Sequence, residues 1–137
     1  MATLPSPEEI RDLIPFAALI GIELLEAGPG LVRGRIAWSP ERCTTGGVLH
    51  GGATMALADT CGAVCAFLNL PEGAAATTTI ESKTNFLRAV RDGAITATTL
   101  PLHTGRTMIV LESEIAREDG ALAAKVSQSQ AFQYPRA

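Results

Sequence analysis

The longest apolar stretch of the chain runs from Ala53 to Leu68 and contains a single charged residue, Asp59. It is rich in alanine and leucine and is apolar on nearly all sides. A helix of that composition belongs in a core, because it has no polar face to turn to water. We therefore predict a central helix wrapped by a curved sheet, with a second copy of the chain helping to cover it.

Four extended segments follow this helix, and each has the alternation or the β-propensity of a strand. Gly-containing turns at residues 91–93 and 118–120 separate some of them and favour antiparallel pairing. In the first strand, alternation favours Thr78 on the same side as Ile80 and Phe86. The predicted strands are residues 77–88, 94–103, 107–117 and 121–132.

Shorter elements precede the helix. Ser6 and Glu9 have the spacing of a capping box, which predicts a helix over residues 7–13, extending toward residue 20. Residues 22–25 and 31–38 read as two strands joined by a Gly-Pro-Gly turn. The order of elements predicts an α+β fold, an antiparallel sheet against one long helix. We find no repeat or linker, so we expect residues 1–137 to form one domain.

Composition narrows the possible functions. The chain is 47% hydrophobic, has a net charge of -3 and lacks a basic run, which argues against nucleic-acid binding. The three cysteines have no metal-ligand or disulfide spacing, and Cys61 and Cys65 fit one helix face as small buried groups. We find no signal peptide and no apolar run of the roughly 18 residues that a membrane span needs. We expect a soluble, cytoplasmic protein with no membrane partner.

Asp59 is the first candidate for chemistry. An unpaired carboxylate in an apolar helix is costly to bury. It is either satisfied by a neighbouring polar group or open water, or held in a partly apolar pocket as a base or nucleophile.

Gly51 and Gly52 stand at the expected start of the same helix, where free backbone N–H groups could bind a developing oxyanion. Gly51 precedes Asp59 by eight residues, which is about 12 Å along a helix. One helix therefore cannot hold a single carbonyl group between the two residues. The spacing suggests an active site shared between two subunits, with Gly51 of one chain near Asp59 of the other.

These residues carry a family resemblance. The run GVLHGGA at residues 47–53, followed by LADT at 57–60, resembles the hotdog-fold acyl-CoA thioesterases of the phenylacetate-degradation type. The strand at 78–88 and the segments 105–107 and 118–120 also match, so that the resemblance covers about residues 15 to 133. It implies a sheet wrapped round one helix, homodimers often paired into homotetramers, and hydrolysis of an acyl- or aroyl-CoA with no cofactor and no metal.

The resemblance also implies roles for individual residues. Asp59 would be the nucleophile or the general base, and Gly51 would polarise the thioester carbonyl through its N–H. His50 would help to position that carbonyl or the loop. Thr78 would orient the water or the carboxylate, with Thr77 and Thr79 left open as alternatives. The family usually has an amide side chain fifteen residues before the acid, where this chain has Thr44.

Substrate contacts are expected from Gly52, Met55, Thr60, Arg88 and Arg106, the two arginines as candidates for the CoA phosphates. The acyl pocket would be apolar, which fits medium-chain or aromatic acyl groups. We expect it to be lined by the N-terminal helix (Leu13, Ile14, Phe16) together with Met55 and Phe67.

Other classes fit less well. No histidine follows Asp59 on the helix, which argues against enoyl-CoA hydratase chemistry, and no GxSxG elbow supports a serine hydrolase. The two histidines and three cysteines lack zinc-ligand spacing. The main alternative is a non-catalytic acyl-CoA-binding protein of the same fold. A scaffold subunit with a closed cavity is a third possibility.

Overall fold

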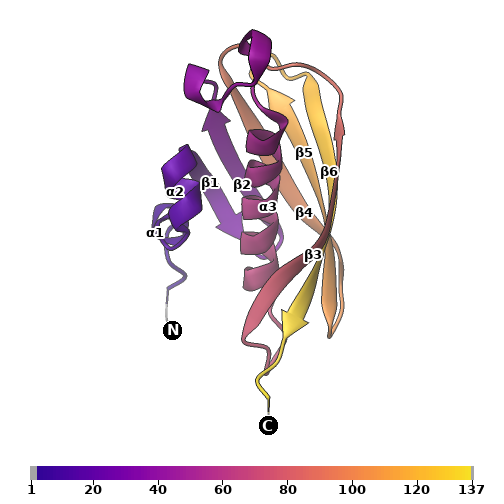
Figure 1. Cartoon of the computed structure of the whole chain (residues 1–137). Helices are drawn as coiled ribbons and strands as arrows, with labels where there is room; N and C mark the ends of the chain where they lie inside the picture. The colour runs from indigo at the N-terminus through magenta and orange to yellow at the C-terminus, as the bar shows by residue number, and fades with distance from the viewer. Residues whose placement is uncertain (1–2, 137) are drawn as a thin grey trace.

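The computed structural model describes residues 3–136, which form a six-stranded antiparallel sheet and three α-helices (Figure 1). Two short 3-10 turns, at Pro40–Arg42 and Thr45–Gly47, lie in the loop before the long helix. The elements are α1 (Pro7–Asp12), α2 (Pro15–Ile20), β1 (Ile22–Gly28), β2 (Leu31–Ala37), α3 (Gly51–Leu68), β3 (Ala76–Phe86), β4 (Ala94–Thr104), β5 (Met108–Arg117) and β6 (Leu122–Gln133).

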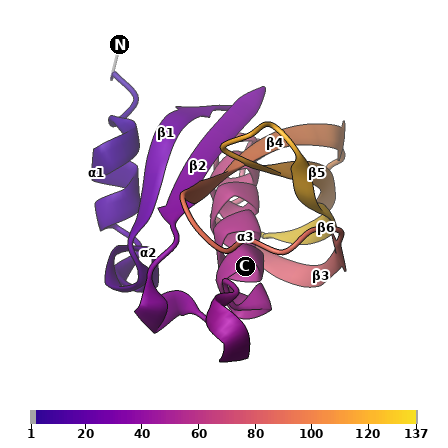
Figure 2. The same cartoon turned by 90° about the horizontal axis from the view of Figure 1, so that it is seen from above.

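The sheet curves around α3. Its strands are hydrogen-bonded in the order β1-β2-β4-β5-β6-β3, and α3 contacts all six strands. Figure 2 shows α3 at the centre of this curve, with α1 and α2 beside β1. The predicted α+β architecture, an antiparallel sheet wrapped round one long helix, is confirmed.

The N-terminal helix begins as predicted. The Ser6 hydroxyl accepts a hydrogen bond from the Glu9 amide, and the Glu9 carboxylate accepts one from the Ser6 amide. The expectation of a single helix continuing toward Ile20 is wrong, because α1 ends at Asp12 and α2 begins at Pro15. The residue before a proline disfavours helical backbone, and Ile14 has an extended conformation.

One face of α3 is open in the single chain. Gly52, Met55, Asp59 and Phe67 are exposed at helical spacing, whereas Leu57, Cys61 and Cys65 on the other face are fully buried. The sheet of one chain therefore leaves part of α3 uncovered, and the predicted cover by a second copy of the chain stays a prediction. The hydrophobic pattern of the sequence did not predict these exposed positions, because three of the four, glycine, methionine and phenylalanine, are no more polar than the buried residues.

The whole of α3 is also long and apolar enough to span a membrane. Its 18 residues have a mean hydropathy of 1.4, and half of them are buried inside the fold. The expectation that the chain has no apolar run of this length is therefore wrong. A helix of similar length and hydropathy also occurs in the core of folded domains, so this feature is weak support for a membrane span.

Strand β3 lies at an edge of the sheet and carries a β-bulge. It pairs with β6, and the register shifts by one residue between Thr79 and Glu81. Before the bulge, the odd-numbered Thr77 and Thr79 make contacts with polar side chains on the inner side of the sheet. Beyond it the even-numbered positions face inward, since the hydroxyls of Ser82 and Thr84 are buried. The extra residue thus reverses the alternation along the strand.

Candidate active site

Two strands place hydrogen-bond donors on the carboxylate of Asp59. The Thr79 hydroxyl, from β3, donates to Oδ1 over 2.7 Å. Nε2 of Gln128, from β6, donates to the same oxygen over 2.5 Å. The Oδ2 atom has no hydrogen-bond partner among residues 3–136, and Asp59 lies on the open face of α3. One oxygen is thus fixed while the other remains available.

Glycine at position 62 allows Gln128 to reach Asp59. A Cβ atom at this position would overlap Oε1 of Gln128 and lie 2.9 Å from its Cδ. The Gln128 side chain therefore crosses α3 where Gly62 leaves room for it. Only 4% of Gln128 is exposed, and burying an amide without a partner is costly. Its hydrogen bond to Asp59 offsets that cost.

A second buried amide extends the network. Gln130, which is fully buried, donates from Nε2 to the Thr79 hydroxyl over 3.0 Å. Its Oε1 accepts a hydrogen bond of 2.8 Å from the Thr77 hydroxyl. The donors therefore run in one direction, from Thr77 through Gln130 and Thr79 to Asp59. Such an arrangement matches a carboxylate at its end, because an ionised carboxylate accepts hydrogen bonds and donates none.

The orientation predicted for Thr78 is wrong. Thr79 contacts Asp59, and Thr77 supports it through Gln130. The prediction assumed that inward and outward side chains alternate regularly from Phe86 back to Thr78. The β-bulge at residue 80 reverses that alternation. Thr79 was one of the two alternatives that the sequence left open.

The first turn of α3 is held by its own N-cap. Nδ1 of His50 accepts a hydrogen bond of 2.8 Å from the Gly52 amide, so that N–H is already used. The Gly51 amide has no acceptor in the part of the chain that the structure describes. The Phe86 ring packs against Gly51, where an added Cβ would lie 3.1 Å from the ring. Gly51 is therefore the residue of this pair whose N–H can serve a ligand.

Thr44, Gly51 and Arg88 line one cavity of about 370 Å³ beside the start of α3. The Thr44 amide donates to the Val48 carbonyl over 2.8 Å, which holds the loop closed. Arg88 donates to the Leu122 carbonyl over 2.7 Å. Three of the predicted site residues thus meet at this end of the molecule.

Thr60 and Arg106 do not join them. Thr60 is buried, with 8% exposed in the single chain, and its expected contact with a substrate stays a prediction. Arg106 is in the turn after β4, where its carbonyl accepts a hydrogen bond from the Tyr134 hydroxyl. Arg88 lies near the first residue of β6 and Arg106 near the last, so within one chain they cannot bind the same phosphate group (Figure 1).

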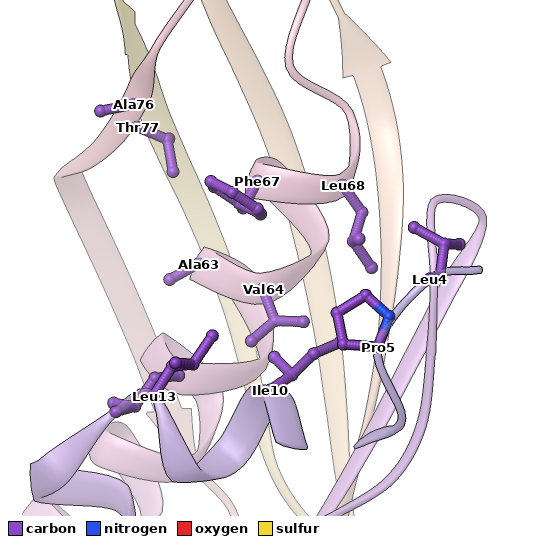
Figure 3. A pocket seen from close by; sticks show the side chains of 11 residues that line it. Leu4, Pro5, Ile10, Leu13, Ala63, Val64, Phe67, Leu68, Ala76 and Thr77 are labelled. Atoms are coloured by element: carbon purple, nitrogen blue, oxygen red, sulfur yellow. The ribbon is translucent and has the colours of Figure 1, made fainter. Parts of the chain in front are cut away.

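An apolar cavity of about 370 Å³ lies between α1, the second half of α3 and the start of β3. Figure 3 shows Ala63, Val64 and Phe67 on one wall, with Ile10 and Leu13 opposite. Of the residues expected to line an acyl pocket, Leu13, Ile14 and Phe67 line this cavity. Phe16 and Met55 do not, and Phe16 instead lines a separate hollow with His50 and Gly52. Thr77 contributes the one polar side chain of the lining, and its hydroxyl already donates to Gln130.

The cysteines pack as small apolar groups. Burial raises the pKa of Cys61 to about 12 and that of Cys65 to about 11, which keeps both thiols protonated at neutral pH. Within residues 3–136 no three histidine, cysteine, aspartate or glutamate side chains are grouped as a metal site would require.

Three residues of the site, Gln128, Gln130 and Gly62, were not predicted from the sequence. The two glutamines lie in a predicted strand between Val126 and Phe132, both buried at positions of the same parity. That parity is a signal for inward-facing amides, but it does not say what they contact. Gln128 is 69 residues from Asp59, and only the fold brings them together.

Comparison with known proteins identifies the family of the chain. The sequence profile of the thioesterase superfamily matches residues 46–124, which include the start of α3, Asp59 and Thr79. The chain belongs to the thioesterase superfamily. The crystal structure of a thioesterase from Haemophilus influenzae is similar to this thioesterase, with a TM-score of 0.89 and 27% identity over 96% of this chain and 93% of that one. The hotdog fold is thereby confirmed, and the chain is a thioester hydrolase.

Two further relatives support this assignment, and one further solved structure shares the fold. A candidate esterase of Deinococcus radiodurans is 31% identical over 125 residues, which are 90% of this chain and 80% of that protein. The 1,4-dihydroxy-2-naphthoyl-CoA hydrolase of Escherichia coli is 37% identical over 76 residues, 56% of this chain and 55% of the hydrolase. The phenylacetic acid degradation protein PaaI of Thermus thermophilus shares the fold, with a TM-score of 0.78 and 22% identity over 87% of this chain and 98% of that one.

Proposed function

We propose that this thioesterase hydrolyses a medium-chain or aromatic acyl-CoA to the free acid and CoA, with Asp59 as the catalytic carboxylate. The observation that carries the proposal is the asymmetry of that carboxylate. Thr79 and Gln128 hold Oδ1, whereas Oδ2 is unpartnered among residues 3–136 on the open face of α3. A carboxylate oxygen held in this way can accept a proton from water or attack a carbonyl carbon directly.

In the general-base route, Asp59 takes a proton from water as the water oxygen adds to the thioester carbonyl. The carbon–sulfur bond then breaks, and the CoA sulfur leaves with the proton that Asp59 returns. In the nucleophilic route, Asp59 itself displaces CoA and forms an anhydride, which water then hydrolyses. A single turnover in ¹⁸O-labelled water detects one form of the nucleophilic route, because attack of water on the Asp59 carbonyl of the anhydride puts the label in the protein. General-base catalysis and attack of water on the acyl carbonyl of the anhydride both put the label in the acid product.

We propose that the second half of the site comes from another copy of the chain. The Gly51 N–H is a donor at the positive end of α3 with no acceptor among residues 3–136, suited to the oxyanion of the tetrahedral intermediate. It lies eight residues from Asp59 on the same helix, about 12 Å away. Pairing of two chains through the open face of α3 would bring Gly51 of one chain toward Asp59 of the other. It would also cover Met55 and Phe67, which are 40% and 58% exposed.

The apolar cavity of Figure 3 supports the proposed acyl preference. Its wall at Ala63 is one helical turn from Asp59, and its single polar side chain is already hydrogen-bonded. Aliphatic or aromatic groups are favoured there, whereas a charged acyl group would lose its hydration without a partner. The substrate of the Escherichia coli relative, an aromatic acyl-CoA, is consistent with this lining. A panel of acyl-CoAs from acetyl to lauroyl, with benzoyl and phenylacetyl, would identify the preferred group.

The Asp59→Asn variant tests the catalytic role. Asparagine keeps an oxygen that can accept the hydrogen bonds of Thr79 and Gln128, so folding and association should survive. We expect the loss of thioester absorbance to slow by about a thousandfold or more, as on removal of an essential base or nucleophile. A rate near that of the unmodified protein would rule out Asp59 as the catalytic acid.

Gly51→Pro tests the proposed donor. Proline suits the first position of a helix and removes the N–H while adding ring carbons beside Phe86, and the extended backbone of His50 is compatible with a following proline. Gly51→Ala is the matched control, since it adds a Cβ but keeps the N–H. We expect a large fall in kcat for the proline variant alone.

Mixing these variants tests the shared site. If Gly51 and Asp59 of different chains form one site, mixed dimers of Gly51→Pro and Asp59→Asn chains contain one intact site. Random reassortment should then restore about a quarter of the unmodified activity. No recovery after exchange, or a fully active monomer in sedimentation, would contradict the model.

A further inference from the structure

We infer that Gln128 is a positioning residue for the reaction, and that Gly62 is glycine in order to admit it. This inference rests on the proposed role of Asp59. Gln128 reaches Asp59 from β6, across Gly62, and not from the open face of α3 that a substrate would approach. It touches the catalytic carboxylate and not the reacting bond, so its effect passes through Asp59.

The geometry assigns Gln128 a specific task. Its Nε2 and the Thr79 hydroxyl donate to one oxygen of Asp59 from two different strands, at 2.5 and 2.7 Å. Two donors from separate elements fix both the position and the rotation of a carboxylate, which a single hydrogen bond leaves free to turn. Oδ2 is thereby held at one place relative to α3. The reaction needs Oδ2 to be held in this way, because an attacking or proton-accepting atom must stay within a few tenths of an ångström of its productive position.

Gln128 and Gly62 are both locally unfavourable residues that fit one another. A glutamine side chain that is 96% buried would be destabilising without a partner, and valine or leucine at this position would satisfy the core at lower cost. Glycine in the middle of a helix is also unfavourable compared with alanine. The chain thus carries two locally unfavourable residues, Gln128 and Gly62, which fit one another and together place a donor on Asp59.

No charged group competes for the contact. The partners of Asp59 among the described residues are uncharged, and the ionisable side chains of the two strands that supply them are engaged or directed elsewhere. Lys125 on β6 pairs with Glu112 and Glu114. Glu81 and Lys83 lie beyond the bulge at odd-numbered positions, on the outer face of β3. A change in the behaviour of Asp59 on substitution of Gln128 therefore reports the lost hydrogen bond.

Gly62→Ala is the sharpest test, because it leaves both Asp59 and Gln128 in the sequence. The added Cβ overlaps the end of the Gln128 side chain and forces it away from Asp59. Alanine favours the helix by about 1 kcal/mol over glycine, which offsets part of the cost of the lost hydrogen bond, so the variant should still fold. We expect kcat for the best acyl-CoA to fall about 10- to 100-fold with KM little changed, as on loss of a hydrogen bond to a charged group.

Substitution of Gln128 completes a double-mutant cycle. Gln128→Ala alone should lower kcat by a similar factor. Adding Gly62→Ala to that variant should cost nothing more, since the side chain that the new Cβ displaces is gone. Gln133→Ala, at the exposed end of the same strand, is the matched control and should keep full activity. Additive losses in the double variant would overturn the inference.

The pH–kcat profile of Gln128→Glu distinguishes a role that acts through Asp59 from a purely structural role. It places a second carboxyl group against Asp59, and two adjacent carboxyls share a proton instead of ionising together. The acid limb of the pH–kcat profile should move to higher pH by about one unit or more. A profile that falls uniformly, with unchanged pH dependence, would contradict positioning through Asp59.

The carboxylate carbon of Asp59 provides a test independent of turnover. The chain has four aspartates, so ¹³Cγ labelling gives few signals, and Asp59→Asn identifies the one of interest. At neutral pH its chemical shift should change in Gly62→Ala and Gln128→Ala but not in Gln133→Ala, because only the first two variants remove a hydrogen-bond donor from the carboxylate. An unchanged chemical shift in those two variants overturns the inference about Gln128, whatever the enzyme hydrolyses. If the chemical shift changes but no acyl-CoA is hydrolysed, the proposed function fails and the Gln128 contact stands.

Discussion

The Thr79 hydroxyl lies 2.7 Å from Oδ1 of Asp59, a contact that regular alternation along β3 would have given to Thr78. The β-bulge at residue 80 makes the difference, because it lets Thr79 share the inner face with Ser82 and Thr84. One irregular residue thus decides which of three consecutive threonines serves the site.

Thr79→Val and Thr78→Val form a matched pair that tests this assignment. Valine keeps the shape and β-propensity of threonine and removes only the hydroxyl. We expect Thr79→Val to lower kcat by about 10- to 100-fold, equivalent to about 1.5–3 kcal/mol for a hydrogen bond to a charged group. Thr78→Val should retain nearly full activity. The opposite ranking in steady-state kinetics would show that the carboxylate is held by the other threonine.

His50 should matter for stability as well as for the site. Its Nδ1 caps α3 by accepting the Gly52 amide, so His50→Ala leaves that amide without an acceptor. We expect the free energy of unfolding in urea to fall by about 1 kcal/mol, whereas His50→Asn, which can cap a helix, should lose much less. Equal losses in the two variants would mean that the cap is not the source of the effect.

The buried Cys61 thiol predicts a loss of stability in alkali. Its pKa is about 12 in the folded chain and 9.0 in the unfolded one, so above pH 9 only the unfolded state ionises. Stability from this group is complete below pH 9 and is lost progressively up to about pH 12, at about 1.4 kcal/mol per pH unit. In Cys61→Ala the free energy of unfolding should decline less steeply with pH than in Cys43→Ala, a half-buried control. Equal slopes would disprove the assignment.

Ala63 offers a way to narrow the apolar cavity of Figure 3. In Ala63→Leu the longer side chain would occupy part of the space beside Phe67. We expect kcat/KM for a medium-chain acyl-CoA to fall about tenfold or more relative to acetyl-CoA, since each methylene excluded from an apolar pocket costs affinity. Ala75→Leu, exposed just before β3, is the control. A uniform loss across chain lengths would place the acyl group elsewhere.

Local patterns were sufficient to predict most of the architecture. Alternation and turn residues placed β3 to β6 within a residue or two of their observed ends, and the apolar run located α3. These features depend on neighbours in sequence, such as the 3.6-residue and two-residue periods. The start of α3, with His50 and Gly51, could be predicted for the same reason, because a helix N-terminus is a local structure.

The rest of the site depends on contacts that no local pattern contains. The β-bulge at residue 80 has no proline or glycine to mark it, so Thr78 was preferred to Thr79. Gln128 and Gln130 resembled any polar residues in a strand, and their inward direction became meaningful only when β6 was placed against α3. Asp59 is exposed because the sheet covers the other side of α3. The nearly uniform apolar composition of the helix did not reveal which side that would be.

The place of β3 at the edge of the sheet links assembly to reactivity. Thr79 projects from a strand whose far side has no hydrogen-bonded neighbour in the chain described, so one of the two restraints on Asp59 is carried by an edge strand. Any chain that pairs with that edge will stiffen the strand and, with it, the carboxylate. Ligand binding and subunit association should therefore strengthen one another, and dilution should weaken turnover before it unfolds the protein.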